Sequence, residues 1–262
     1  MQYGFIGCGN MGGAIARGLS NSTKNIMVSD RSGKAASLAA ELGLVYGDNA
    51  TIARECQAIF LGVKPHMMKD VLRPLQQILA ERKPLLISMA AGLTLQTIES
   101  FVGVRLPMIR IMPNTPTALG KGVIPYCCND LVSDEQLYAW KEDMQPCGLV
   151  DPIEERLMDG VSALSGSGPA YLYVMMEAMA DGAVACGIPK EKALEYAAMT
   201  MVGAAEIYLQ THTHPAALKD AVCSPGGSTI AGIRVLEQNG FRGAVMDCVA
   251  AAYQRNKELG KG

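Results

Sequence analysis

The sequence predicts an α/β protein in which a doubly wound parallel sheet over residues 1–152 is followed by an all-helical region over residues 153–262. Three observations predict this arrangement. Short apolar runs alternate with longer amphipathic segments as far as about residue 150, a glycine-rich turn follows the first of these runs, and the strand-like runs stop at Asp151-Pro152. The length of 262 residues suits two domains of about 100–200 residues each.

Six apolar runs are the candidate strands, and four segments between them are the candidate crossover helices. The strand runs cover residues 3–6, 26–29, 58–63, 85–89, 108–112 and 122–127. The helical segments carry apolar residues at spacings of three and four, and they cover residues 11–20, 34–42, 67–80 and 94–101. Strands that alternate with helices in this way form βαβ units, so we expect a parallel sheet with helices on both faces.

The turn Gly7-Cys8-Gly9-Asn10-Met11-Gly12 joins the first predicted strand to the first predicted helix. In that context the spacing of its glycines indicates a Rossmann-type dinucleotide-binding fold. The first glycine permits the tight turn, the second lets the backbone approach the pyrophosphate, and the third lets the helix pack closely on the strand. We expect the helix N-terminus to face the phosphates with free N–H groups. The alternative is a glycine-rich turn that holds no ligand. It does not explain why the turn lies directly between a predicted strand and a predicted helix.

The choice between the two nicotinamide dinucleotides depends on Ser29-Asp30-Arg31-Ser32, which ends the second predicted strand. At this place an acid accepts a hydrogen bond from the ribose 2′-hydroxyl of NAD, whereas an arginine holds the 2′-phosphate of NADP. Arg31 and the two serine hydroxyls favour NADPH, and an inward-pointing Asp30 favours NADH. We predict that NADPH is preferred and that NADH is possible. If Asp30 and Arg31 instead form an ordinary solvated charge pair in a turn, the choice of cofactor stays open.

Two other loops are expected at the cofactor. The predicted strand over residues 58–63 ends in Val63-Lys64-Pro65, and ligands of open parallel sheets bind outside the carboxyl ends of the strands. We therefore expect this loop to flank the nicotinamide-side ribose. Asn49 is expected to reach the adenine ribose. His66 is a candidate general acid, but a single histidine on a loop is more often a surface residue.

The helical half contains segments rich in Ala, Met and Leu over residues 169–186, 190–210, 216–223, 229–238 and 241–259. Hydrophobic residues make up 49% of the chain and charged residues only 18%, and residues 175–180 are apolar on more than one helix face. A lone bundle would leave this surface in water, so we predict a helical dimer interface. The alternative is that the methionines of this half, which include Met179 and Met199, fill an intramolecular core.

A second glycine-rich turn, Ser224-Pro225-Gly226-Gly227-Ser228-Thr229, precedes another predicted helix. Its glycines expose backbone N–H groups, and Ser228 and Thr229 add hydroxyl groups at the N-terminus of the helix. This pattern is typical of an anion-binding helix terminus. The alternative is that the two hydroxyls only cap the helix.

Composition excludes several classes of function. The formal net charge is −2, and no run of Lys and Arg is present, so we expect no nucleic-acid partner. The eight cysteines show neither CxxC nor Cys-His spacing, which predicts reduced thiols and no metal site. The N-terminus has no basic segment before its short apolar run, and no stretch of ~18 apolar residues occurs, so we expect a cytoplasmic protein without a membrane partner.

Three segments together resemble the pyrroline-5-carboxylate reductase family. They are Arg110-Ile111-Met112-Pro113-Asn114-Thr115-Pro116, Leu164-Ser165-Gly166-Ser167-Gly168-Pro169-Ala170-Tyr171 and the 224–229 turn. The similarity runs essentially from end to end, and the Gly-Gly-x-Thr sequence of the 224–229 turn is its most specific motif.

The resemblance implies NAD(P)H-dependent reduction of 1-pyrroline-5-carboxylate to L-proline, the last step of proline biosynthesis. It also implies a C-terminal dimerisation domain and a homodimer or a larger ring of dimers. By resemblance, Thr229 lies near the ring nitrogen as a donor or water positioner, and Gly226, Gly227 and Ser228 hold the substrate carboxylate. Asn114 is expected where nicotinamide and substrate meet, although it could instead only shape its turn.

Two alternative functions are weighed. A β-hydroxyacid dehydrogenase shares this domain order but uses a lysine four residues after the Gly-x-Gly of its second domain. Here Leu172 stands four residues after Gly168, so no base for alcohol oxidation is evident. A non-catalytic NADP(H)-sensing protein would not need the hydroxyl-lined 224–229 turn.

Overall fold

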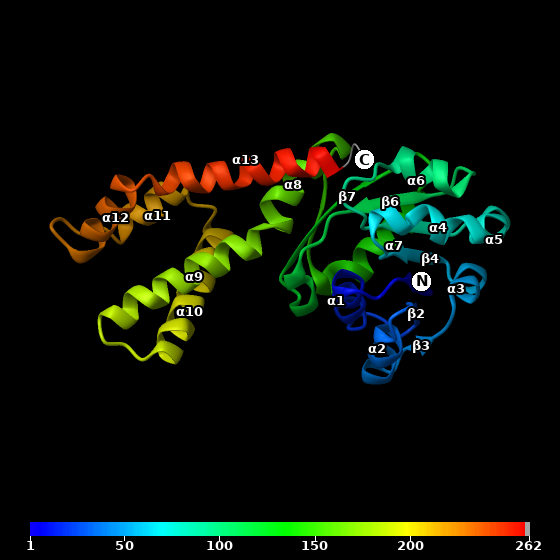
Figure 1. Cartoon of the computed structure of the whole chain (residues 1–262), viewed down its shortest axis with the longest axis horizontal. Coiled ribbons are helices and arrows are strands. Elements are labelled where there is room, and N and C mark those ends of the chain that lie inside the picture. The colour runs from blue at the N-terminus through cyan, green and yellow to red at the C-terminus, as the bar shows by residue number, and fades with distance from the viewer. Residues whose placement is uncertain (260–262) are drawn as a thin grey trace. The chain divides into compact units, whose positions relative to one another are not determined.

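The computed structural model describes residues 1–259 and contains one eight-stranded sheet (Figure 1). The strands lie in the order β3-β2-β1-β4-β5-β6-β7-β8. They are β1 (Tyr3–Ile6), β2 (Ile26–Ser29), β3 (Val45–Tyr46), β4 (Ala58–Leu61), β5 (Leu85–Ser88), β6 (Met108–Ile111), β7 (Gly122–Cys128) and β8 (Gly148–Pro152). The order changes direction between β1 and β4, which confirms the doubly wound sheet and creates a crevice at its carboxyl edge.

Helices cover both faces of the sheet. The α-helices are α1 (Asn10–Leu19), α2 (Lys34–Leu42), α3 (Asn49–Glu55), α4 (Met68–Leu72), α5 (Gln76–Arg82), α6 (Leu95–Val102), α7 (Asp134–Met144), α8 (Met158–Val161), α9 (Gly168–Ala185), α10 (Lys190–Thr211), α11 (Pro215–Ala221), α12 (Ser228–Gln238) and α13 (Phe241–Leu259). One core lies between the sheet and α1, α2 and α7, and a second core lies between the sheet and α3 to α6.

Each central strand contributes to both cores because successive side chains point to opposite faces. In β1, Tyr3 and Phe5 belong to the core beneath α1 and α2, whereas Ile6 belongs to the core beneath α3. Phe5 stacks on Phe60 of β4 with ring centroids 4.4 Å apart. Burial on both faces explains why these strands are continuous apolar runs in the sequence.

Two sequence-based predictions about this sheet and its helices are wrong. The segment 67–80 is not one helix: it divides into α4, the 3₁₀ turn η2 (Arg73–Leu75) and α5, because Pro74 has no N–H to continue an α-helix. The sheet is also not wholly parallel, since β7 runs antiparallel to β6. A parallel neighbour needs a crossover of about a dozen residues or more, and the connection after Ile111 is too short to provide one.

The described chain forms two compact units. The first comprises Met1–Ser167 together with the segment from Ala252 onward, and the second comprises Gly168–Ala251. The last strand, β8, ends at Pro152, where the sequence predicts that strands stop. The boundary between residues 152 and 153, as the limit of an independent domain, stays a prediction.

The second unit exposes much of its apolar surface. Helices α9 and α10 pack against each other, but the side chains they bury are only alanines, at positions 180, 193 and 197. Met179 is 39% exposed and Met199 is 64% exposed. These methionines therefore do not fill an intramolecular core, and the surface they form is larger than a solitary subunit normally leaves in water.

The C-terminal end of α1 approaches its neighbours through Gly18. A Cβ atom at this position would lie 2.6 Å from the Cys147 Sγ and 2.9 Å from the Thr117 carbonyl oxygen. Thr117 belongs to the 3₁₀ turn η3 (Thr115–Leu119), and Cys147 ends the 3₁₀ turn η4 (Gln145–Cys147). The absence of a side chain at Gly18 thus sets the distance at which α1 packs against both turns.

We predict that Gly18→Ala lowers the free energy of unfolding by about 1–3 kcal/mol, because the added methyl group overpacks a buried contact. Gly13→Ala in the same helix is the matched control. Its Cβ would find its nearest neighbour, the Cys8 carbonyl oxygen, at 3.7 Å. The control should be neutral or stabilising by up to ~1 kcal/mol through helix propensity. Urea unfolding measures both changes, and equal effects of the two substitutions would contradict the packing argument.

Candidate functional site

Three glycines determine how β1, α1 and β4 meet at the carboxyl edge of the sheet. Gly7 has a φ of +101°, in the region that favours glycine. A Cβ on Gly12 or on Gly62 would lie 2.2 Å from the Gly7 carbonyl oxygen. The backbones are therefore in direct contact, and no residue with a side chain fits at Gly12 or Gly62 without moving them.

Gly9 lies in the same turn but in a different environment. A Cβ at Gly9 would have no heavy atom within 4 Å, so the backbone here faces open space. Gly9 is the N-cap of α1, no side chain caps the helix, and the first turn contains no acidic residue. The N-terminus of α1 thus offers free N–H donors and positive potential to an anion that approaches Gly9.

A cavity of about 780 Å³ opens beside this turn, within the size range of small-molecule sites. Of the residues predicted to bind the cofactor, it is lined by Gly7, Cys8, Gly9, Ser29, Asp30, Arg31, Asn49, Val63 and Lys64. Asn10 instead lines a neighbouring cavity, and Met11, Gly12 and Pro65 line neither of the two. His66 is exposed in the 3₁₀ turn η1 (Pro65–Met67) and lines neither cavity either.

Polar side chains at the end of β2 have distinct partners. The Ser29 hydroxyl donates to Asn49 Oδ1 at 2.5 Å, which leaves the amide N–H groups of Asn49 available as donors. The Asp30 carboxylate accepts from the Ser32 hydroxyl at 2.8 Å and from the Gly33 N–H at 3.0 Å. Within the described chain the Arg31 guanidinium has no hydrogen bond or ion pair. The Asp30 carboxylate thus shapes its own turn, whereas the Arg31 guanidinium is available to a ligand.

The far side of the cavity is apolar and was not predicted. It is formed by Met67, Val71, Pro74 and Leu75, from the region where the sequence suggested a single helix. Tyr46, which ends the short strand β3, and Gly47 also line it. A two-residue strand leaves no periodic signal in a sequence, so this wall could be found only from the fold.

Cys8 lies under the turn as a neutral thiol. It is 3% exposed, and burial, with a further contribution from the Asp30 charge, raises its pKa to about 12. The thiol therefore keeps its proton at neutral pH and adds no negative charge beneath the N-terminus of α1. An open backbone at Gly9, free donors and this volume together fit a dinucleotide.

Asn114, predicted to contact the substrate, holds two backbone segments together after β6. Its Nδ2 donates to the Ser165 carbonyl at 3.0 Å, and its Oδ1 accepts from the Val123 N–H at 2.9 Å. Ser165 belongs to a short π-helix, η6 (Ser162–Gly166), in which the Ser165 hydroxyl donates to the Val161 carbonyl at 3.0 Å. Asn114 is 6% exposed and shapes this π-turn.

The 224–229 turn leads into α12 in the second unit. Gly226 has a φ of +69°, and the Gly227 N–H donates to the Ser224 carbonyl at 3.0 Å. Gly227 is the N-cap of α12, and no side chain caps the helix. The hydroxyls of Ser228 and Thr229 are exposed and have no partner within the described residues, so the interpretation that they serve only as caps is wrong.

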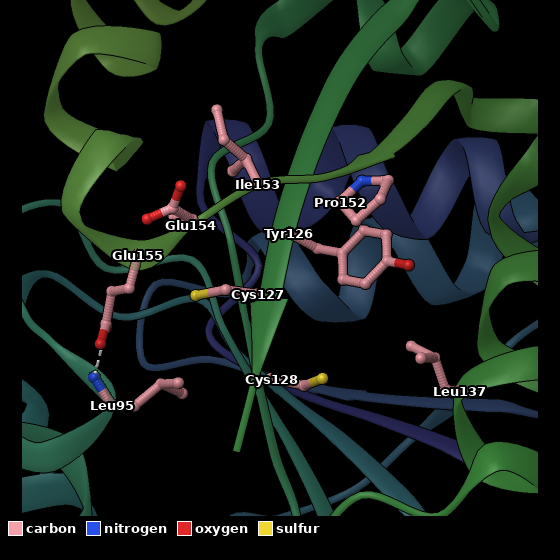
Figure 2. Close-up of a pocket in the computed structure, with 9 residues that line it drawn as sticks. All are labelled: Leu95, Tyr126, Cys127, Cys128, Leu137, Pro152, Ile153, Glu154 and Glu155. Atoms are coloured by element: carbon pink, nitrogen blue, oxygen red, sulfur yellow. Dashed lines mark hydrogen bonds between the residues drawn. The ribbon is translucent and has the colours of Figure 1, made fainter. Parts of the chain in front are cut away.

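Another cavity, of about 650 Å³, lies beside the end of β7 and contains none of the predicted site residues (Figure 2). Cys127 and Cys128 point to opposite sides of the strand. Burial raises the pKa of Cys127 to about 12, and Glu155 accepts from the Leu95 N–H at 2.7 Å and from Arg110 at 3.1 Å. Burial also raises the pKa of Cys128, and Glu154 is paired with Arg156, so both thiols favour the protonated form and both carboxylates have a partner.

Residues 1–259 contain neither a metal-binding cluster nor a membrane-spanning helix. No group of His, Cys, Asp or Glu side chains in this range has the arrangement needed to hold a metal ion. None of its helices combines the length and the apolar content needed to cross a membrane.

Comparison with protein families gives two matches that follow the two units. Residues 155–259 match the family model described as pyrroline-5-carboxylate reductase dimerisation. Residues 2–92 match the model described as NADP oxidoreductase, coenzyme F420-dependent. The first match covers the helices with the exposed apolar surface, and the second covers the glycine turn and the cavity beside it.

Individual relatives extend over nearly the whole chain. A pyrroline-5-carboxylate reductase from Pisum sativum is 37% identical over 98% of this chain and 95% of its own length. One from Synechocystis is 44% identical over 82% of this chain and 79% of its own length. The crystal structure of Plasmodium falciparum pyrroline carboxylate reductase with NADP bound superposes with a TM-score of 0.87 at 32% identity, over 99% of this chain and 98% of that one.

The environments of Gly9 and Gly12 predict different effects of the same substitution. We expect Gly9→Ala to change the free energy of unfolding by less than about 0.5 kcal/mol, because its methyl group enters open space and its φ of −64° suits alanine. Dinucleotide affinity should fall about tenfold, because the methyl group occupies the approach to the backbone. Gly12→Ala should lower both stability and affinity. Isothermal titration and urea unfolding test this, and unchanged affinity in Gly9→Ala would contradict it.

Proposed function

The chain belongs to the pyrroline-5-carboxylate reductase family, and we infer that it reduces 1-pyrroline-5-carboxylate to L-proline with NAD(P)H, the last step of proline biosynthesis. The observation that carries this inference is the near-complete coverage of family members at 37% identity or more. Two uncapped helix N-termini, those of α1 and α12, support it from the chemistry: one suits the cofactor phosphates and the other a substrate carboxylate.

The reaction adds a hydride to the imine carbon and leaves a protonated ring nitrogen. When bound, NAD(P)H supplies the hydride. The protein has to hold the planar ring by its carboxylate, keep the nitrogen protonated and orient the imine carbon. Orientation of this kind removes a large part of the barrier without a covalent intermediate.

We propose that the 224–229 turn holds the substrate carboxylate. The left-handed Gly226 sets the direction of the turn, and the bond from the Gly227 N–H to Ser224 closes it. Because that N–H is engaged, the donors that remain are the backbone N–H groups of the first turn of α12 and the Ser228 hydroxyl. The N-terminal end of the helix dipole favours the negative charge.

Thr229 is proposed as the residue at the ring nitrogen. Its hydroxyl is exposed and has no partner among residues 1–259, so it can donate or accept a hydrogen bond or position a water molecule. A threonine hydroxyl is a much weaker acid than an imidazolium, so its role is to accept a hydrogen bond from the N–H that the protonated imine already carries and thereby orient the ring nitrogen. Asn114 is proposed to act beside the substrate through the backbone segments that its amide joins.

The enzyme uses a nicotinamide dinucleotide, and we propose that NADPH is preferred over NADH. The free Arg31 guanidinium and the occupied Asp30 carboxylate support this preference, because the acid that would select NAD is already bound to its own turn. The relative from Plasmodium falciparum was crystallised with NADP.

The chain is a homo-oligomer, as the match to a dimerisation family indicates. We propose a dimer formed through the exposed faces of α9 and α10, with rings of dimers as a further assembly. The proposal includes a cytoplasmic location, which the eight free thiols suit, and no nucleic-acid partner.

The rival reactions are less consistent with the chain. Leu172 occupies the position of the lysine that a β-hydroxyacid dehydrogenase needs, and it is 53% exposed in α9. A non-catalytic NADP(H) sensor would have no use for the exposed hydroxyls of the 224–229 turn.

Purified protein should oxidise NADPH when 1-pyrroline-5-carboxylate is added, and NADH more weakly. Absorbance of the reduced nicotinamide measures both rates. A 3-hydroxy acid with NADP is the control for the dehydrogenase reaction. Turnover of the hydroxy acid, with none of the imine, would overturn the assignment.

Thr229→Val should lower kcat about 10²-fold, because it replaces the hydroxyl that orients the ring nitrogen by a methyl group of the same size. NADPH affinity should be unchanged, because Thr229 belongs to the substrate side. Thr229→Ser keeps the hydroxyl and should recover most of the rate. Equal loss of cofactor affinity and of turnover in Thr229→Val would contradict this role.

A further inference from the structure

A groove of about 470 Å³ lies between α1 and α2, on the other side of the glycine turn from the cofactor cavity. Cys8 and Gly9 line both spaces, so the two adjoin at the turn. The groove is lined by Asn10, Gly13 and Arg17 on one side and by Lys34, Ser37 and Glu41 on the other. It therefore connects the phosphate-facing backbone with the first turn of α2.

The charges in this groove do not balance. Arg17 forms a two-pronged ion pair with Glu41, with Nη2 2.6 Å from Oε2, and those two charges cancel. Lys34 has no hydrogen bond or ion pair within the described residues. It is exposed, and the first turn of α2 contains no acidic residue. The groove thus retains one uncompensated positive charge, that of Lys34.

The position of Lys34 relates this charge to the ribose end of the cofactor. β2 ends at Ser29, and α2 begins at Lys34, so the loop between them carries Arg31 at its tip. Lys34 is the first residue of α2, directly after this loop, and it lines the groove that adjoins the glycine turn. A ribose at the end of β2 would then have Arg31 on the cavity side and Lys34 on the groove side.

We propose that Lys34 is a second specificity-determining residue, which binds the 2′-phosphate of NADPH together with Arg31. This proposal rests on the assigned use of NAD(P)H and deepens it. A 2′-phosphate carries close to two negative charges, which one guanidinium leaves partly uncompensated. Arg31 can bind two phosphate oxygens in a planar fork, whereas the ammonium of Lys34 acts as a compact point charge on the remaining oxygen.

The partners of the neighbouring acidic residues support this division of roles between Arg31 and Lys34. Asp30 is held by Ser32 and Gly33, and Glu41 is held by Arg17, so neither carboxylate competes for Lys34. The pyrophosphate, which NADH also has, is served by the uncapped N-terminus of α1 at Gly9. Lys34 should consequently affect the cofactor with the 2′-phosphate and leave the other unaffected.

The test measures binding of 2′,5′-ADP and of 5′-AMP to the intact protein by isothermal titration, so it does not depend on turnover. Lys34→Met should weaken 2′,5′-ADP about tenfold and leave 5′-AMP unchanged, and Lys34→Arg should restore most of the affinity. Lys24→Met is the matched control. Lys24 is exposed, precedes β2 at the opposite edge of the sheet and changes the net charge equally.

The other possible outcomes separate a specific role of Lys34 from general electrostatics and from the assigned reaction. Equal weakening of both nucleotides by Lys34→Met, or weakening by Lys24→Met as well, would overturn the proposal in favour of general electrostatics. Loss of 2′,5′-ADP binding in Arg31→Ala but not in Lys34→Met would leave the NADPH preference intact and overturn the role of Lys34. Selective loss in Lys34→Met, in a protein that fails to reduce the imine, would support Lys34 and overturn the assigned reaction.

Discussion

The contact between the backbones of Gly7, Gly12 and Gly62 is the constraint on which the rest of the first unit depends. Because a Cβ on Gly12 or Gly62 would come within 2.2 Å of the Gly7 carbonyl oxygen, α1 starts directly on the ends of β1 and β4. That closeness directs the N-terminus of α1 at the crevice where the strand order changes. It also leaves Gly9 facing open space, so the same turn that closes the fold on one side opens the cofactor site on the other.

The electrostatics around this turn follow one pattern: acidic groups are engaged by the protein, and basic groups are left for the ligand. Asp30 accepts two hydrogen bonds from its own loop, Asp48 caps α3 by accepting from the Thr51 N–H, and Cys8 stays protonated. Arg31 and Lys64 line the cavity, and neither has a hydrogen bond or ion pair with any of residues 1–259. A ligand with several phosphate charges therefore meets little competition, which is what selectivity for a phosphorylated cofactor requires.

The sequence was sufficient for the features whose residues are neighbours in the chain. Their positions were predicted closely because the signals are local: apolar residues at regular spacing, with Gly or Pro at the ends of the elements. This applies to the glycine turn, the fully buried strands and the helices after residue 168. The antiparallel direction of β7 was not predicted, because a strand's direction depends on the length of its connection and not on its composition. The same holds for the bond between Ser29 and Asn49, whose partners are 20 residues apart, and for the apolar wall around Val71. Asn114 was identified as important, but its two backbone partners required the fold.

The helical unit leaves many large apolar side chains exposed within one subunit. Hydrophobic burial contributes about 25 cal/mol for each Å² of apolar surface removed from water. α9 and α10 bury only alanines, while Tyr173, Val174 and Val202 are each more than half exposed. The large side chains of these helices are therefore only partly removed from water within the subunit. Residues 155–259 match a dimerisation family, so the apolar composition that first suggested an interface agrees with the exposed positions of these residues on the helices.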